Sequence, residues 1–105
     1  MEIDIQIVTT FITYIEVITY PLKLKKNKIV SKYRDFFTNS ENISLFPLNI
    51  QVSEEVAYFR AFYNLKMPDA IQLATAKICG ADIVITNDKN WKKIKELKIV
   101  LIDEI

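Results

Sequence analysis

The fold is decided by the stretch from Pro68 to Asp88, in which Pro68-Asp69-Ala-Ile-Gln-Leu-Ala-Thr-Ala76 leads to Gly80 and then to Asp82-Ile-Val-Ile-Thr-Asn-Asp88. A proline and an acid are typical of the first turn of a helix, and a glycine is typical of its end. The apolar run at residues 82–86 lacks polar alternation, which predicts a strand covered on both faces, as in a parallel sheet. This helix and this strand give Asp69 and Asp88 defined positions.

Strands and helices alternate along the rest of the chain. Short apolar or β-branched runs predict strands at residues 4–9, 42–48 and 98–102. Apolar residues at helical spacing predict helices at residues 10–20, 29–39, 53–63 and 88–97, the first ending at Pro21 and the third starting at Ser53-Glu54-Glu55. We therefore expect an α/β fold of three layers, α/β/α, with a parallel sheet. A chain of 105 residues is enough for one such domain, residues 1–105.

The composition limits the kinds of metal site and catalytic nucleophile that the chain can form. The sequence has no His and a single Cys, which excludes a zinc site of nitrogen and sulfur ligands and a nucleophile activated by His. Any metal would therefore bind oxygen ligands, which favours magnesium or manganese. The net charge of +1 argues neither for nor against a nucleic-acid partner. The N-terminus lacks a signal peptide, and polar residues interrupt the apolar stretch at residues 3–22, so we expect a cytoplasmic protein without a membrane span.

Three acids are candidates for one site. Sites in open parallel sheets form beyond the carboxyl ends of the strands, and Thr86-Asn87-Asp88 follows such an end. Glu16 comes about a turn and a half into the helix after another predicted strand, and Asp69 lies at a helix N-terminus. If Glu16, Asp69 and Asp88 converge, their mutual repulsion favours a divalent cation, which could activate water against a phosphodiester.

Each of these features also has a simpler explanation. Asp69 is equally explained by its favourable interaction with a helix N-terminus, Asp88 by capping of the next helix, and Glu16 by a solvated helix position. Trp91 is better explained as a core residue than as a platform for a base. Two basic groups are consistent with phosphate contacts or with solvated faces; they are Lys23, Lys25, Lys26, Lys28, Lys32 and Arg34, and then Lys89, Lys92, Lys93 and Lys95.

Taken together, Glu16-Val17, the run from Pro68 to Ala76, Gly80-Ala81-Asp82 and Thr86-Asn87-Asp88 resemble the PIN-domain family, which includes the VapC-type ribonuclease toxins of toxin-antitoxin systems. The resemblance covers nearly the whole chain. It implies a nuclease that acts on RNA and depends on magnesium or manganese. It also implies that Glu16, Asp69 and Asp88 are the catalytic metal ligands, and that Thr86 and Asn87, with Lys89 beside them, contact the nucleic acid.

The sequence departs from the family pattern at its start. The family has a strand ending in an Asp-Thr-Asn-like motif before the strand predicted at residues 4–9, and that strand lies in the middle of the family's sheet. Nothing here replaces the first acid, because Glu2 and Asp4 precede the strand. We therefore expect an N-terminally incomplete PIN-like domain, with two pairs of strands whose unpaired edges face each other. Such edges favour rearrangement, closure of the gap or a homodimer formed by strand exchange.

Two functions follow from this pattern. The first is a VapC-type ribonuclease, weakened or inactive because one acid is missing, with RNA as substrate and an antitoxin protein as a possible partner. The alternative is a non-catalytic PIN-like remnant that serves as a protein-binding or dimerisation module. A flavodoxin-like nucleotide binder has less support, because the single Gly cannot form a phosphate-binding loop.

Overall fold

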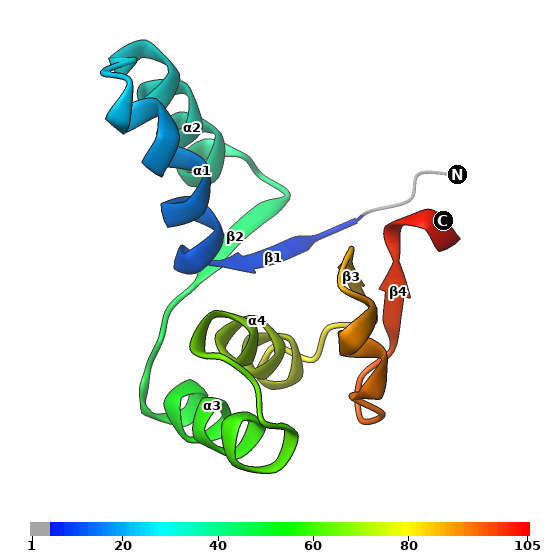
Figure 1. Ribbon diagram of the computed structural model, residues 1–105. Coiled ribbons are helices and arrows are strands. Elements are labelled where there is room, and N and C mark those ends of the chain that lie inside the picture. Colours follow the sequence, from blue (N-terminus) through cyan, green and yellow to red (C-terminus); the bar gives the residue numbers. More distant parts are fainter. Residues whose placement is uncertain (1–4) are drawn as a thin grey trace. The chain divides into compact units, whose positions relative to one another are not determined.

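The computed structural model, which describes residues 5–105, confirms an α/β fold with parallel strands (Figure 1). The chain divides into two compact units, Met1–Leu48 and Asn49–Ile105. The expectation of one domain over residues 1–105 stays a prediction. Glu2, Asp4 and the predicted start of the first strand lie outside the described residues.

The first unit consists of two parallel strands joined by a helical hairpin. Its elements are β1 (Ile7–Thr10), α1 (Phe11–Lys23), α2 (Asn27–Asn39) and β2 (Ile43–Phe46). Ile7 lies opposite Ile43 in the β1–β2 register. The rings of Tyr14 and Phe37 meet edge to face at 5.6 Å between their centroids, which ties α1 to α2. The predicted strands and the second predicted helix are thus confirmed to within a few residues.

The first helix begins as its sequence indicates but ends later than expected. Thr10 caps α1, because its side-chain oxygen accepts a hydrogen bond from the N–H of Ile12. The prediction that Pro21 stops the helix was wrong, since α1 continues through Pro21 to Lys23. A proline removes its own N–H donor and its ring crowds the carbonyl one turn before it, but it does not prevent the residues after it from staying helical, so α1 ends two residues after Pro21 and the carbonyl of Pro21 accepts from the N–H of Lys26.

The second unit contains a helical hairpin followed by two parallel strands. Its elements are α3 (Ile50–Tyr63), α4 (Met67–Ile78), β3 (Val84–Thr86), the 3-10 helix η1 (Lys89–Lys93), β4 (Ile99–Leu101) and the 3-10 helix η2 (Ile102–Glu104). β3 and β4 pair in a register that sets Val84 opposite Ile99. Pro68 lies in the first turn of α4, which confirms the predicted helix start.

Two predicted helices of this unit differ from the structure. α3 begins at Ile50 rather than at Ser53, because the side chain of Asn49 accepts a hydrogen bond from the N–H of Val52 and so caps the helix three residues earlier. The helix predicted at residues 88–97 was too long. The structure has only the five residues of η1 there, because the backbone becomes extended at Ile94, where the buried side chain of Ile94 follows the buried Trp91 of η1.

Gly80 ends α4 as predicted. Its φ of 70° lies in the left-handed region, which glycine adopts without steric cost. The N–H of Gly80 donates to the carbonyl of Lys77, and the N–H of Ala81 donates to the carbonyl of Ala76. These two bonds form the Schellman motif and satisfy carbonyls that the helix end would otherwise leave unpaired.

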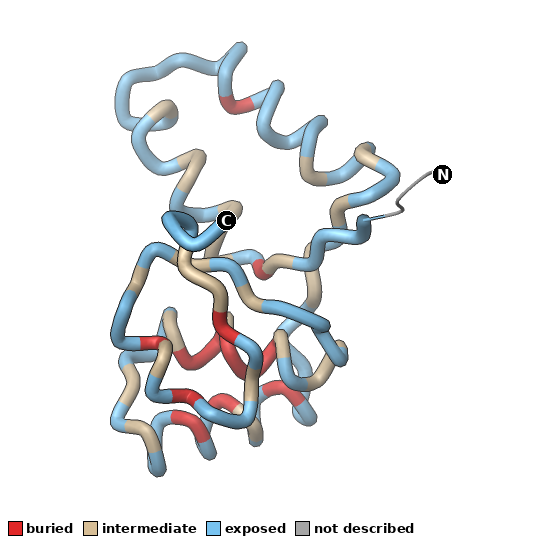
Figure 2. Tube along the Cα trace, turned by 90° about the vertical axis from the view of Figure 1, so that its right-hand side faces the viewer, coloured by how far each residue is buried: buried red, intermediate tan, exposed pale blue. Residues whose placement is uncertain are grey.

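The buried apolar side chains are unevenly distributed (Figure 2). In the second unit they line α3, α4, η1 and β4, and the largest with less than 2% exposure are Phe59, Leu73, Ile94 and Val52. In the described part of the first unit, Val30 is the only buried apolar residue. The α3–α4 hairpin therefore carries most of the core.

The strands form two separate parallel pairs, β1 with β2 and β3 with β4. This confirms the expected two pairs, whereas a single continuous parallel sheet is not formed by the described residues. The expectation that the strand at residues 82–86 is covered on both faces was wrong, because Ile83 and Ile85 are 44% and 53% exposed. A two-stranded sheet with one helical hairpin beside it has too few neighbours to cover both faces. Among residues 5–105, no helix has the length and apolar character needed to cross a membrane.

Candidate functional site

Asp69 lies in the first turn of α4, next to Pro68. The unpaired N–H groups at this end of the helix favour a negative charge, typically by 0.3 to 1 kcal/mol. Asp69 is half-buried, whereas the following residues Ala70 and Ile71 are buried and hold this turn in the core. The carboxylate is therefore carried by a helix end whose position is fixed by packing.

Asp88 lies just beyond the carboxyl end of β3, in a hydrogen-bonded turn. Its backbone N–H donates to Thr86 Oγ1 at 3.0 Å, and its Oδ1 accepts from the N–H of Asn90 at 2.9 Å. Asp88 is thus the N-cap of η1, which confirms the simpler explanation for this residue. The same bonds fix the side chain at the strand end, where sites form in parallel α/β folds. Capping and ligand binding are compatible, because a carboxylate has two oxygens.

The segment after Asp88 is held in place by buried side chains and by polar contacts of Lys92. Trp91 and Ile94 are buried, so Trp91 is a core residue as expected. Lys92 donates through Nζ to the carbonyl of Ile99 and forms an ion pair with Glu104 at 2.9 Å. Lys92 and the N–H of Leu101 together hold the pKa of Glu104 below its usual value. These contacts attach η1 to β4.

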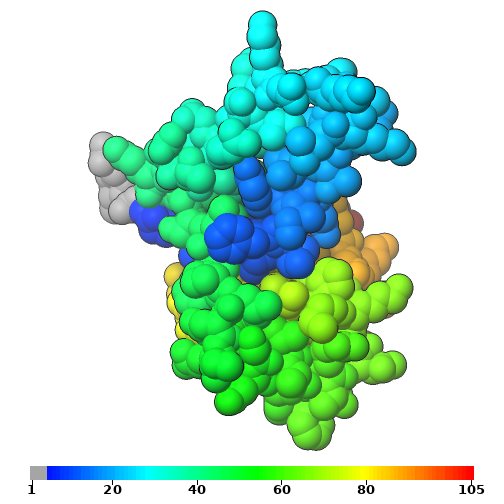
Figure 3. All heavy atoms as spheres, turned by 90° about the vertical axis from the view of Figure 1, so that its left-hand side faces the viewer, coloured from blue at the N-terminus to red at the C-terminus, as the bar shows by residue number. Residues whose placement is uncertain are grey.

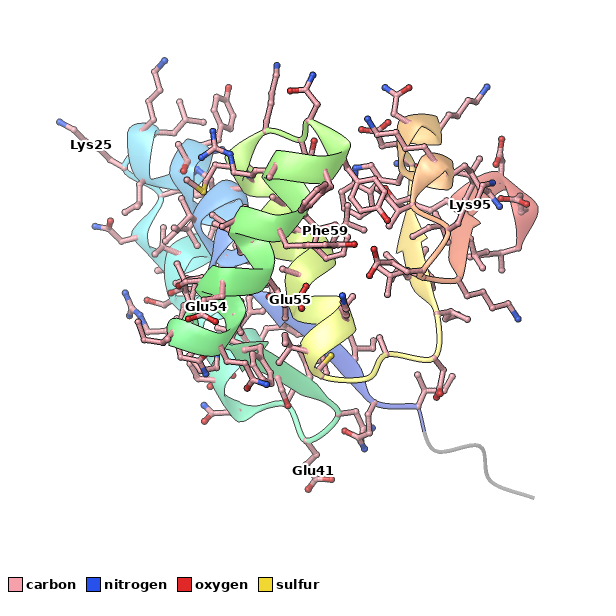
Figure 4. The ribbon with its side chains drawn as sticks, turned by 90° about the horizontal axis from the view of Figure 1, so that it is seen from below. Lys25, Glu41, Glu54, Glu55, Phe59 and Lys95 are labelled. Atoms are coloured by element: carbon pink, nitrogen blue, oxygen red, sulfur yellow. The ribbon has the colours of Figure 1, made fainter. Side chains whose placement is uncertain are left out.

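A second set of contacts, which we call the Glu96 clamp, joins the chain after η1 to both helices. Glu96 accepts from the Tyr63 hydroxyl at 2.6 Å and forms an ion pair with Lys77 at 2.8 Å. Lys77 also lies 3.2 Å from Glu55 and 4.8 Å from the centre of the Tyr58 ring. Figure 4 shows Glu55 and Phe59 one turn apart on the same side of α3.

The Glu96 clamp shifts the pKa values of its members. The hydrogen bond to Lys77, followed by the one from Tyr63, lowers the pKa of Glu96. The hydrogen bonds that Lys77 and Tyr63 donate to Glu96, with its negative charge as a smaller cause, raise the pKa of Lys77 and raise the pKa of Tyr63 to about 12. The clamp thus favours an ionised Glu96, a charged Lys77 and a neutral Tyr63, and it connects the ends of α3 and α4 to the segment that follows Asp88.

The three predicted acids are distributed over both units. Asp69 and Asp88 belong to the second unit, whereas Glu16 is an exposed residue of α1 in the first. Within the part of the chain that the structure describes, no group of three or more His, Cys, Asp or Glu side chains is gathered so as to hold a metal ion. The three-acid set, like the contacts predicted for Thr86, Asn87 and Lys89, stays a prediction.

The donors that the second unit offers fit a hard cation. Asp69 and Asp88 are half-buried carboxylates, and the ion pairs of the described residues involve other acids. Oxygen donors of this kind are the ligands of magnesium and manganese. Asn87 and Lys89, on either side of Asp88, are exposed and accessible to a polyanion.

The fold agrees with a comparison against known protein families. The family model of the PIN domain matches residues 1–97, so the chain belongs to the PIN-domain family. PIN domains are in general nucleases that depend on a divalent metal. No curated protein and no solved structure matches the chain significantly.

The Glu96 clamp could not be predicted from the sequence. Glu55, Tyr63, Lys77 and Glu96 come from three different segments, and each is unremarkable in its own helix or loop. The only local signal was the pair Phe59 and Tyr63, four residues apart on α3, whose rings stack at 5.4 Å. That spacing indicates a helix face but does not identify what the face contacts.

Proposed function

We propose that the chain is a ribonuclease of the VapC toxin type, with Glu16, Asp69 and Asp88 as ligands of magnesium or manganese. The observation that carries this proposal is the PIN family match over residues 1–97, which spans all three acids. The helix-end position of Asp69 and the strand-end position of Asp88 support it. In a PIN-like sheet these are positions at which acidic side chains can share a cation.

A bound divalent metal would supply the charge that activates water and stabilises a phosphodiester as it is cleaved. The chain's own residues would position the acids and the RNA. The N–H of Asn90 holds Asp88 Oδ1, and Thr86 Oγ1 holds the backbone of Asp88, so the second carboxylate oxygen of Asp88 can face a ligand. Asn87 and Lys89 are proposed to contact the phosphates beside the cleaved bond.

The same proposal includes partners and location. A VapC-type toxin would act on RNA in the cytoplasm, be neutralised by an antitoxin protein and form a homodimer. Each of these is an expectation carried by the subfamily assignment rather than by a contact within the chain.

The test is a manganese titration by calorimetry, combined with cleavage of single-stranded RNA. We expect saturable manganese binding that weakens by about 10- to 100-fold or more in Asp69→Asn and in Asp88→Asn. Asparagine keeps the oxygen that accepts the capping bond from Asn90, so Asp88→Asn leaves η1 intact. Asp82→Asn, an exposed acid just before β3, is the matched control and should bind manganese as the unmodified chain does.

A non-catalytic binding or dimerisation module is the second candidate. Its supporting observation is that β1 and β3 each have a strand partner on one side only among the described residues, and apolar side chains are exposed on or directly before these strands; these are Ile7, Val8, Ile83 and Ile85. Exposed apolar strands favour pairing with another chain. A homodimer in light scattering, without manganese binding, would support this second function. A monomer that cleaves RNA with manganese would refute it.

A further inference from the structure

Residues 17–34 contain no acid and six basic side chains, and we call this segment the basic hairpin. Its cations are Lys23, Lys25, Lys26, Lys28, Lys32 and Arg34. The whole chain has 14 basic and 13 acidic residues. Removing the six cations leaves 8 basic and 13 acidic residues, a charge of −5 against +6 for the basic hairpin. The net charge of +1 therefore conceals a strong separation of charge along the chain.

All six cations of the basic hairpin are exposed. They come from the end of α1, the connection to α2 and the first turns of α2, and Figure 3 shows this segment, from blue to cyan, projecting into solvent. The ion pairs of the described residues all involve Lys77 or Lys92, so none neutralises the hairpin. An unneutralised concentration of positive charge attracts a polyanion.

The turn of the basic hairpin is fixed by backbone hydrogen bonds. The N–H of Lys25 donates to the carbonyl of Leu22, and the N–H of Lys26 donates to the carbonyl of Pro21. Lys25 itself has φ of 57°, a left-handed conformation that favours glycine. The turn thus presents a lysine where glycine would be the less strained residue, and Figure 4 shows Lys25 pointing away from the rest of its hairpin.

Two exposed aromatic rings lie among the cations. Tyr20 and Tyr33 are 65% and 37% exposed, one on α1 and one on α2. Aromatic rings interleaved with basic side chains are the pattern of single-stranded nucleic-acid binding, because bases stack on the rings while the cations contact the phosphates. An acidic peptide or a simple anion would use the cations alone.

We infer that the basic hairpin is a binding surface for single-stranded RNA, separate from the acids of the second unit. The inference rests on the proposed ribonuclease function, because it identifies where the substrate strand is held outside the cleavage site. The cations supply sequence-independent affinity for the phosphates, and Tyr20 and Tyr33 supply the preference for a strand with unstacked bases.

The test measures binding without cleavage. Fluorescence anisotropy of a short fluorescein-labelled single-stranded RNA is followed in EDTA, with increasing salt, for the full chain carrying Asp88→Asn. Substituting Lys25, Lys26, Lys28 and Lys32 by Gln should raise the Kd by at least about tenfold and reduce the salt slope by up to about 3, since each phosphate contact in a single strand contributes about 0.7.

The matched control substitutes four exposed lysines of the second unit by Gln, namely Lys66, Lys93, Lys95 and Lys98. It makes the same change in net charge and should raise the Kd by less than about threefold. Equal losses of affinity in both variants, or no loss in the hairpin variant, would overturn the inference. Circular dichroism shows whether each variant keeps its helices.

A competition experiment separates RNA from an acidic protein partner. Polyglutamate should displace the RNA only at a higher concentration of charge than unlabelled RNA requires. Tyr20→Ala combined with Tyr33→Ala should weaken the binding of RNA but not of polyglutamate. Equal competition, together with no effect of the tyrosine substitutions, would assign the basic hairpin to an acidic protein instead. Because manganese is absent throughout, failure here leaves the metal-binding test of the proposed function unaffected.

Discussion

The two units use similar elements but stabilise them differently. Each has a helical hairpin and a pair of parallel strands. The second unit buries apolar side chains from four of its elements, whereas the first, over its described residues, buries Val30 alone and leaves Phe11, Ile15 and Phe36 about half exposed. Large apolar residues (Val, Ile, Leu, Met, Phe and Tyr) are not scarcer in the first unit, since α1 and α2 carry 13 of them and α3 and α4 carry 11, so what differs is the packing of these residues and not their supply.

This difference in packing gives the two units different properties: the second holds its acidic side chains in fixed positions, and the first exposes charged and apolar side chains to solvent. Asp69 and Asp88 are attached to the unit with the core, where packed neighbours such as Ala70 and Trp91 hold their backbone in place. A buried apolar side chain contributes about 1.5 to 3 kcal/mol relative to an exposed one. The first unit lacks most of that contribution and instead presents charge and apolar surface to solvent. We therefore expect substitutions of buried residues in the second unit to lower the free energy of unfolding more than those in the first.

The largest expected effect is the loss of a core aromatic ring. Phe59→Ala, at a position with 0% exposure, should lower the free energy of unfolding by about 3 to 5 kcal/mol through the cavity it leaves. Phe62→Ala is the matched control, because Phe62 lies on the same helix and is 74% exposed. Urea unfolding followed by the fluorescence of Trp91, the single Trp, measures both. Similar losses in the two variants would refute the description of the core.

A buried valine in each unit tests the comparison of the two units directly. Val52 and Val30 are 0% and 5% exposed, so burial alone predicts similar losses of about 1.5 kcal/mol for either change to Ala. Val52 belongs to a unit with several other buried apolar residues, whereas Val30 has no other buried apolar residue in the described part of its unit. A cavity beside few neighbours can relax, so we expect Val30→Ala to cost less than Val52→Ala. A larger loss for Val30→Ala would show that the first unit has a core of its own.

The next largest effect on stability is expected at the C-terminal ends of α1 and α4. α1 and α4 end in the same Schellman hydrogen bonds, with Lys25 in the left-handed position in one and Gly80 in the other. Gly80→Ala should destabilise the protein by about 1 to 2 kcal/mol through backbone strain, since a Cβ at Gly80 meets nothing within 4 Å. Lys25→Gly should relieve strain and change stability by less than about 1 kcal/mol, because glycine also gains freedom in the unfolded chain. Thermal unfolding of both variants checks that Gly80→Ala lowers the stability more than Lys25→Gly changes it.

The sequence was informative where the signal is local. Pro68 and Gly80 bound α4 because their backbone chemistry fits those two positions, whatever the rest of the fold does. Asp88 caps η1 for the same reason. The family was suggested by the resemblance of the motifs between Glu16 and Asp88 to PIN domains, and it is confirmed by the match over residues 1–97.

The sequence was less informative where two local signals compete or where contacts are distant. Asn49 and Ser53 are both good capping residues, and only the packing of Val52 into the core selects the earlier one. Pro21 is a helix breaker in general, but it disturbs the turn before it and not the residues after it, so α1 ends two residues later, at Lys23. The exposure of Ile85 depends on how many elements cover the strand, which no property of the strand itself determines.

The competition between Asn49 and Ser53 as the capping residue of α3 gives a further prediction. Asn49→Ala should cost about 1 kcal/mol, because the N–H of Val52 loses its capping acceptor. Ser53→Ala should cost less than about 0.5 kcal/mol, since Ser53 is exposed and only donates to a carbonyl one turn back. Urea unfolding of the two variants compares them under the same conditions. A larger loss for Ser53→Ala would restore the helix start predicted from the sequence.

The smallest expected effect on stability concerns the Glu96 clamp. The described residues of the first unit contain no equivalent set of contacts. The side chains of Lys77 and Glu96 remain 37% and 25% exposed, so at neutral pH Glu96→Gln should cost no more than about 1 kcal/mol. The pKa of Glu96 is lowered, so its contribution is present above the usual glutamate value of about 4.3 and is lost as the pH falls through the folded-state pKa.

The clearer readout of the Glu96 clamp is the ionisation of Tyr63. Its pKa of about 12 lies above the usual value of about 10, so the stabilising contact is complete below pH 10 and is lost as the pH rises toward 12. In Glu96→Gln the negative charge is gone, and the pKa of Tyr63 should fall toward 10. An ultraviolet titration, with Tyr63→Phe to assign the signal, measures this shift. Glu104→Gln is the control, because Glu104 is also ion-paired but contacts Lys92 and not Tyr63, and a shift of Tyr63 in that variant would contradict the direct role of Glu96.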